Sequence, residues 1–180
     1  MSTDESAVAR NELRWTAAVV ATIGVVFVAI VSATLVFHDQ PPSHRETIDP
    51  TTMHLSGEFV EGNLGTSVGP DGGVTTRFVA AQFAFVPQCA VVPQGKPVTL
   101  RLASPDVIHG ILVMGTNVNT MVVPGYISEV HTVFAESGDY LMPCHEFCGL
   151  GHGEMMAHIR VVPSSQFNPD KNGKVGCGLR

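Results

Sequence analysis

The reactive side chains of this sequence are concentrated in one short segment, residues 144–155. The segment contains two thiols, an imidazole and a thioether, at Cys144, Cys148, His152 and Met155. Three glycines lie among them, and they let the backbone turn tightly enough for the four side chains to converge on one point. The segment therefore has the composition of a metal-binding loop.

The ligand types in this loop favour copper. Thiolate and thioether sulfurs are soft ligands that suit copper, particularly Cu(I), whereas zinc sites use thiolate, imidazole and carboxylate. One cysteine with two histidines would describe a single blue-copper ion. Two cysteines, each able to bridge, instead favour two copper ions that share two sulfurs, and each ion then needs an imidazole. His152 supplies one, and His109 is the candidate for the other because it lies at the mouth of an apolar strand segment.

Other readings of the cysteines stay open at this point. Cys144 and Cys148 could form a local disulfide in an oxidising compartment, or could bind one zinc ion with His109 and His152. Cys89 and Cys177 are either a small strand residue and a tail thiol, or a second disulfide. The remaining histidines are expected at the surface or in the linker, at positions 38, 44, 54, 131, 145 and 158.

The elements around the loop have the composition of short strands. Residues 74–85, 96–102, 110–114 and 130–135 are rich in β-branched or alternating apolar residues, with turn residues between them. Residues 140–142 and 157–162 flank the metal-binding loop in the same way. This pattern predicts an all-β antiparallel sandwich or small barrel, in which an early strand end and a late hairpin loop can share one pole.

One apolar segment, residues 16–37, contains no Asp, Glu, Lys or Arg. As a helix it would span roughly 33 Å, enough to cross the hydrocarbon core of a bilayer. Arg10 and Arg14 precede it, so the positive-inside rule predicts a cytoplasmic N-terminus and an external folded part. The alternative is a cleaved signal peptide with a site near residues 31–33.

The chain therefore divides into five expected parts. They are a cytoplasmic tail (1–15), a transmembrane helix (16–37), a linker or membrane-surface segment (38–68), the β-domain with the metal loop (69–163) and a loose C-terminal tail (164–180). The net charge of −6 excludes a nucleic-acid binder that acts through a basic patch. The single span excludes a channel or pump.

The pattern Cys-x-Glu-x-Cys-x3-His-x2-Met, with Ser-Pro-Asp-Val-Ile-His upstream, resembles subunit II of haem–copper cytochrome c oxidases and its binuclear CuA domain. The likeness runs from about residue 83 to residue 162, and a single anchor is similar to the B-type oxidases. The resemblance implies a cupredoxin-like sandwich in an electron-transfer subunit of the oxidase, held in the plasma membrane. It accepts electrons from cytochrome c or a small copper protein, and passes them to haem in subunit I.

The resemblance also implies a set of site residues. The copper ligands map onto His109, Cys144, Cys148, His152, Met155 and the backbone carbonyl of Glu146. The Glu146 side chain is a candidate ligand for a magnesium ion shared with subunit I, although several B-type relatives have Gln there. Where relatives carry Tyr-Gln-Pro-Asn-Pro, residues 85–89 lack an aromatic hydroxyl, which leaves Phe83 and Phe85 as candidates for electron uptake.

Three other classes of protein share parts of this pattern. Nitrous oxide reductase carries a similar copper domain at the end of a much longer soluble enzyme. The quinol oxidase subunit II keeps the fold without the thiol ligands. A membrane-tethered copper chaperone would bind exchangeable Cu(I) instead of a fixed binuclear centre.

Overall fold

Alternating burial shapes the strands of the folded domain. Every second residue of β2 (Val74–Ala81) and of β10 (Met156–Val162) is buried, while the residues between them are exposed or partly exposed. Successive side chains of a strand point to opposite faces, so each of these strands turns one face to the core. The computed structural model describes residues 3–36 and 46–177.

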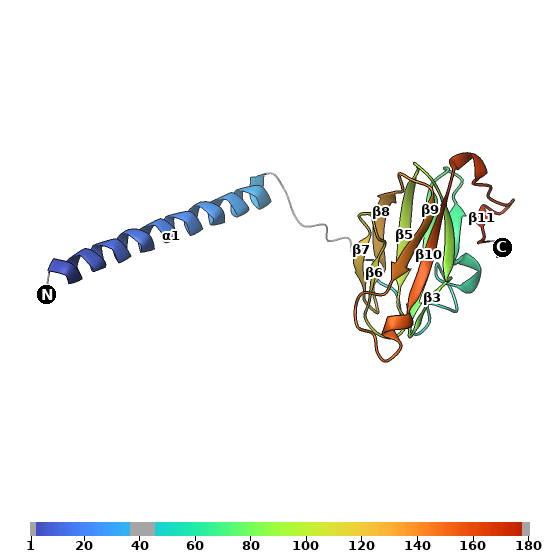
Figure 1. Ribbon diagram of the computed structural model, residues 1–180, viewed down its shortest axis with the longest axis horizontal. Helices are drawn as coiled ribbons and strands as arrows, with labels where there is room; N and C mark the ends of the chain where they lie inside the picture. Colours follow the sequence, from blue (N-terminus) through green and yellow to red (C-terminus); the bar gives the residue numbers. More distant parts are fainter. Residues whose placement is uncertain (1–2, 37–45, 178–180) are drawn as a thin grey trace. The chain divides into compact units, whose positions relative to one another are not determined.

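The N-terminal helix α1 spans Thr3–Val36 (Figure 1). Within the described residues, its segment Ser6–Leu35 is the one helix long and apolar enough to cross a membrane. The expected end of the span at Phe37, and residues 38–45 of the expected linker, lie outside the described residues. The helix and the β-domain are separate units.

The β-domain consists of two main sheets and a small third one. The larger sheet has the order β11-β1-β2-β5-β8, with β3 also paired to β2, and the second has the order β4-β10-β9. A further pair, β6-β7, carries the first metal-ligand candidate. The other strands are β1 (Gly65–Val68), β3 (Ala84–Val86), β4 (Cys89–Pro93), β5 (Pro97–Ala103), β6 (His109–Leu112), β7 (Asn119–Val122), β8 (Ser128–Val133), β9 (Gly138–Pro143) and β11 (Lys174–Val175). The described residues also form short 3-10 helices, which are η1 (Glu61–Asn63), η2 (His152–Glu154) and η3 (Ser164–Gln166).

The expected all-β, cupredoxin-like sandwich with an N-terminal apolar helix is confirmed. Its pairing is mixed instead of wholly antiparallel, because β2 pairs with β5 and β4 pairs with β10 in parallel. The chain leaves the larger sheet after β3 and forms β4 in the second sheet. It then returns to the larger sheet as β5, which runs parallel to β2. A crossover between sheets of this kind brings parallel neighbours together.

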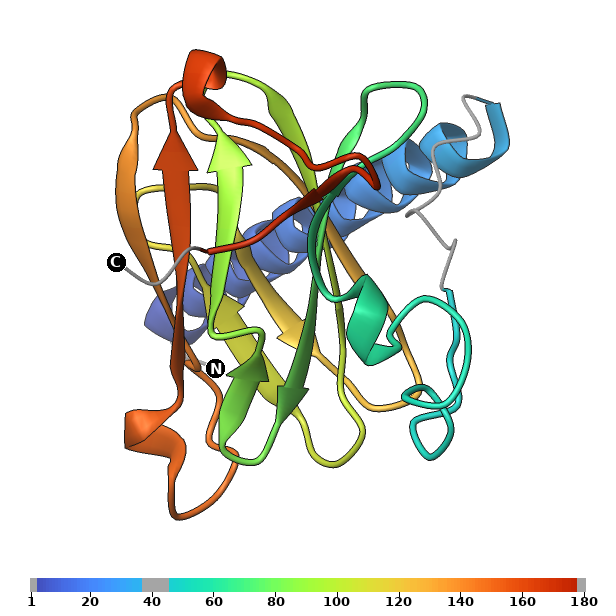
Figure 2. The same ribbon diagram turned by 90° about the vertical axis from the view of Figure 1, so that its right-hand side faces the viewer.

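The main core lies between the sheets and continues to the metal-binding loop. It contains side chains from both main sheets, such as Phe78, Leu100 and Ile159, and also Cys144 and Met155. The loop between β9 and β10, in orange, lies at the same end of the domain as the β2–β3 hairpin, whereas η3 lies at the opposite end (Figure 2). The apolar core therefore supports the loop from beneath.

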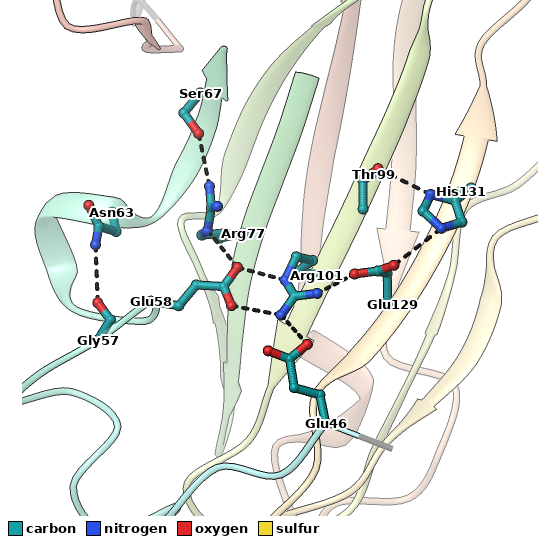
Figure 3. Close-up of polar contacts among 10 residues, drawn as sticks. All are labelled: Glu46, Gly57, Glu58, Asn63, Ser67, Arg77, Thr99, Arg101, Glu129 and His131. Carbon is teal, nitrogen blue, oxygen red and sulfur yellow. Dashed lines mark hydrogen bonds and ion pairs between the residues drawn. The ribbon is translucent and has the colours of Figure 1, made fainter. Parts of the chain in front are cut away.

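The segment before β1 packs on the domain, although the sequence predicts a linker or membrane-surface segment there. Met53 and Phe59 are buried against Ala103, and Glu58 accepts hydrogen bonds from Arg77 and Arg101 (Figure 3). Arg101 also pairs with carboxylates at residues 46 and 129. The apolar side chains and the ion pairs together hold residues 46–64 against the outer face of the larger sheet.

The C-terminal segment is also tied to the domain, in contrast to the loose tail that the sequence predicts. β11 pairs with β1, and Cys177 forms a disulfide with Cys89 at the start of β4. The disulfide joins residues 88 positions apart. The open question about these two cysteines is thereby answered in favour of a pair.

Candidate metal centre

The metal-binding loop begins where β9 ends and closes where β10 begins, so the antiparallel pair holds both of its ends. The backbone N–H of Cys144 donates to the carbonyl of Met155 at 2.9 Å, and Cys144 also forms an isolated bridge with Ile111 of β6. The N–H of His145 donates to the carbonyl of Gly110 at 3.1 Å. These contacts fix the loop beside β6, whose first residue is His109.

The donor atoms from these two places converge. The sulfurs of Cys144 and Cys148 lie 3.9 Å apart. Nδ1 of His109 is 3.9 Å from the Cys144 sulfur, and Nδ1 of His152 is 3.7 Å from the Cys148 sulfur. The Met155 thioether lies 3.6 Å from the Cys148 sulfur. Each thiol thus has an imidazole of its own, and the thioether completes the group.

Most of this group is shielded from water. His109 is 0% exposed, Met155 is 1% exposed, and the two cysteines are buried. His152 is half-buried and lies on the outward side of the group. The arrangement is a dry donor cluster with one imidazole towards the surface.

A carboxylate sets the orientation of His109. Oδ1 of Asp106 lies 2.9 Å from Nε2 of His109, which leaves Nδ1 to face Cys144. Burial by itself raises the pKa of Asp106, but the hydrogen bonds that it accepts from Gln82 N–H, His109 and Val107 N–H hold that pKa below its ordinary value. Asp106 therefore stays ionised and fixes the His109 ring, as carboxylates beside metal-binding histidines do.

The two cysteines of the loop are free thiols. Their separation of 3.9 Å is well beyond the roughly 2.05 Å of a disulfide bond, so the reading of Cys144 and Cys148 as a disulfide is wrong. Burial, and next the neighbouring Cys144, raise the pKa of the Cys148 thiol to about 11. Without metal the site holds a protonated thiol there, and a metal that binds it must displace the proton.

Glu146 contributes its backbone carbonyl to the group, since that oxygen accepts a hydrogen bond from the Cys144 thiol at 3.2 Å. Its side chain is half-buried. Gly110 packs beneath it, because a Cβ added at Gly110 would lie 2.6 Å from His145 Nδ1 and 3.1 Å from Glu146 Cβ. The side chain of exposed His145 interacts with Asn119 at 2.7 Å, away from the sulfurs.

The two phenylalanine candidates have different positions. Phe85 is fully buried in the core, so it forms no part of a surface that an electron donor could touch. Phe83 is 40% exposed and lies against the metal-binding loop at Gly149 and Gly151. Phe83 lies in the turn between β2 and β3, beside the loop, whereas Phe85 lies in β3 and points into the core.

Two residues that contact the site are not predicted from the sequence, Asp106 and Gln82. Asp106 stands three positions before His109, a spacing that could have marked it as a partner of the imidazole. Gln82 donates a hydrogen bond from its side chain to the carbonyl of Cys148, and no local pattern marks it. Only the fold brings Gln82 to a residue 66 positions away.

The donor set suits copper. Ligand atoms of His109, Cys144 and Cys148 all lie within 4.8 Å of one another. The buried thioether of Met155 beside them is a soft ligand that a zinc site would not use. Two thiols, two imidazoles and the thioether are five side-chain donors, one more than a single four-coordinate ion needs.

Comparisons with known proteins agree with this chemistry. A family model described as the periplasmic domain of cytochrome c oxidase subunit II matches residues 77–162. A protein named cytochrome c oxidase subunit 2 from Thermus thermophilus is 37% identical over 140 residues, which cover 76% of this chain and 83% of the relative. Another protein of that name from Thermus thermophilus is 38% identical over 122 residues, which cover 67% of this chain and 90% of the relative.

A solved structure is similar over most of its length. It is the structure of a heme-copper terminal oxidase dimer, and one of its chains superimposes with a TM-score of 0.51 at 25% sequence identity. The superposition covers 86% of this chain and 99% of the other. It therefore includes more of the chain than the metal-binding domain alone.

Proposed function

Since this chain belongs to the cytochrome c oxidase subunit II family and is thus a subunit of a haem–copper oxidase, we propose that it is the subunit through which electrons reach the oxidase, by way of a binuclear CuA centre. The observation that supports this most directly is the pair of thiol sulfurs 3.9 Å apart, each with an imidazole nitrogen within 4 Å. Two sulfurs at this separation can bridge two ions.

The ligands that we propose are His109, Cys144, Cys148, His152, Met155 and the carbonyl of Glu146. When bound, the copper pair supplies one-electron redox chemistry between a soluble donor and the haem of subunit I. The protein holds the donors on the first residue of β6 and on the loop that β9 and β10 anchor at both ends, so their positions change little between oxidation states. The shielding of His109 and Met155 excludes water from the cluster.

Subunit I is the partner that membership of this family implies, and the donor is proposed to be cytochrome c or a small copper protein. Half-buried His152 lies on the outward side of the cluster, and the loop around it exposes Phe147 and Leu150. Phe83 lies against the same loop. We propose that the donor docks over this apolar surface, and that the chain's negative charge attracts a basic donor at low salt.

The carboxylate of Glu146 is proposed as a ligand to a magnesium ion shared with subunit I. The support is its position: its carbonyl belongs to the copper donor group, while its half-buried side chain makes no hydrogen bond or ion pair with the rest of the described chain. A carboxylate oxygen is the type of ligand that magnesium prefers. Such an ion would connect the loop to the neighbouring subunit.

We propose a single-pass protein of the plasma membrane, with α1 as a retained anchor, the N-terminus in the cytoplasm and the β-domain outside. Arg10 and Arg14 at the start of α1 support this orientation. The disulfide between Cys89 and Cys177 supports it independently, because such bonds persist in oxidising compartments outside the cytoplasm.

Copper content and electron spin resonance of the full chain in detergent test the function. We expect two copper ions per chain and a spin shared by both, and we expect Cys148→Ser to abolish the shared-spin signal. The double substitution Cys89→Ser/Cys177→Ser is the matched control, since it removes two sulfurs outside the site and should keep the signal. A parent chain that binds a single copper ion would contradict the proposal, and so would a Cys148→Ser variant that keeps the shared spin.

A further inference from the structure

Gln82 makes polar contacts with two parts of the site: the metal-binding loop, and the Asp106 carboxylate that orients His109. It lies in the turn between β2 and β3, and its side-chain amide donates a hydrogen bond to the carbonyl of Cys148. Its backbone N–H donates to Oδ2 of Asp106 at 2.7 Å. The other oxygen of Asp106 holds His109 at 2.9 Å. One residue thus connects the loop that carries Cys148 with the carboxylate that holds His109.

We propose that Gln82 is a positioning residue for the copper centre. Its amide fixes the peptide that follows Cys148, and its N–H fixes the carboxylate that orients His109. This inference rests on the function proposed above, because it concerns the geometry of the same site.

The contact to Cys148 matters because the tip of the loop has few other polar ties. Among the described residues, the Gln82 amide is the one hydrogen-bond donor from outside residues 144–155 that reaches the backbone of residues 146–151. The other backbone bonds at this tip, such as His152 N–H to the Gly149 carbonyl at 3.1 Å, lie within the loop. The Gln82 bond therefore fastens the tip to the sandwich.

The packing beside Gln82 supports the same role. Gly149 has φ +130°, a conformation that glycine adopts readily and that other residues rarely do. A Cβ added there would lie 2.8 Å from the Phe83 ring and 3.1 Å from the Gln82 amide nitrogen. The loop backbone thus lies directly on the 82–83 turn, which places the amide where it can reach the Cys148 carbonyl.

The expected effect of losing this bond is moderate. One hydrogen bond contributes roughly 1 kcal/mol, which corresponds to a factor of about five in an equilibrium or a rate. We therefore expect the Gln82→Met variant, which keeps the side-chain length and the backbone N–H, to bind two coppers and to lose them about fivefold faster. The freer loop should also change the copper hyperfine pattern and shift the midpoint potential.

Gln94→Met provides a matched control. The Gln94 amide also donates to a backbone carbonyl, that of Ala135 at 2.9 Å, but Gln94 lies in the β4–β5 turn at the opposite end of the domain. Both variants lose one amide–carbonyl bond, so both should lower the thermal stability of the copper-free chain to a similar degree. Only the Gln82 variant should alter the copper signature.

The experiment uses the full chain in detergent, loaded with copper and then mixed with an excess of a Cu(I) chelator. Copper release, electron spin resonance and midpoint potential are measured for the parent and both variants. Unchanged release and an unchanged spectrum in Gln82→Met would overturn the inference, as would equal changes in Gln94→Met.

A measurement without copper separates this inference from the proposed function. In the copper-free chain, Gln82→Met should speed hydrogen exchange of the His152 and Glu154 amides about fivefold, and Gln94→Met should not. If the parent chain fails to bind two coppers while this exchange result holds, the function is wrong and the loop-fastening role of Gln82 stands. If the exchange is unchanged, the inference itself fails.

Discussion

Gly151 gives the sharpest test of how the metal-binding loop packs. A Cβ added there would lie 2.5 Å from Cγ, 2.7 Å from Cδ2 and 2.9 Å from Cβ of Phe83. The backbone at Gly151 has φ −91° and ψ 11°, which an alanine can adopt. The effect of Gly151→Ala is therefore steric and involves no backbone strain.

The size of the effect follows from these distances. Carbon atoms in contact normally lie about 3.5–4.0 Å apart, so the loop or the Phe83 ring must move by about 1 Å. Overpacking of this kind costs about 1–3 kcal/mol. Phe83 is 40% exposed and can give way in part, so we expect about 1.5 kcal/mol, or roughly 6 °C in the melting temperature of the domain. Cys148 and His152 lie on either side of this position, so copper should also be released faster.

The assay is thermal unfolding of the copper-free chain, followed by copper release from the loaded chain. Gly153→Ala is the control in the same loop, because nothing lies within 4 Å of a Cβ added there. In a double-mutant cycle, Phe83→Ala should relieve most of the cost of Gly151→Ala, with a coupling of about 1 kcal/mol. Equal stabilities of the two alanine variants, or strict additivity in the cycle, would refute this account of the packing.

Two further outcomes are expected. Met155→Leu should keep both coppers and shift the midpoint potential, because a buried thioether is replaced by a side chain of similar volume without a sulfur. Complete loss of metal, measured as copper content, would contradict the view that the other proposed ligands hold the ions without Met155. Burial alone would raise the pKa of Glu58, but Arg101 and Arg77 more than offset this effect and lower that pKa below 4.5. The ionised Glu58 therefore stabilises the fold above about pH 4.5, and this contribution is lost as the pH falls through the pKa of Glu58 in the folded protein. Glu58→Gln should therefore lower the free energy of unfolding by about 2 kcal/mol at pH 7. This difference, measured by chemical denaturation, should shrink as the pH falls below 4.5, and a difference that stays constant there would contradict the charge-based explanation.

The sequence predicts the loop well because its donors are contiguous. Cys144, Cys148, His152 and Met155 lie within one turn-rich segment between two strands, and the structure brings their donor atoms together. His109 could be matched to them because a strand end and a hairpin loop can share one pole. The sandwich itself follows from alternating residues and evenly spaced turns.

Contacts that depend on distant parts of the fold could not be predicted. Nothing local connects Gln82 with Cys148, and the two-residue strand β11 is too short to show alternation. The burial of Met53 and Phe59 depends on a complementary surface around Ala103, which a sequence pattern does not reveal. The parallel pairing of β2 with β5 depends on the path of the chain between the two sheets.

The bond between Cys89 and Cys177 makes the chain a covalent ring, and every proposed copper ligand, from His109 to Met155, lies inside that ring. A closed ring limits how far residues 89–177 can separate when the domain unfolds, so the unfolded chain has less conformational entropy to lose when the ligands come together. The ring can form only after residue 177 has been synthesised. Oxidation of Cys177 thus precedes the tethered state, in which His109 and the distant loop can come together with a smaller loss of chain entropy.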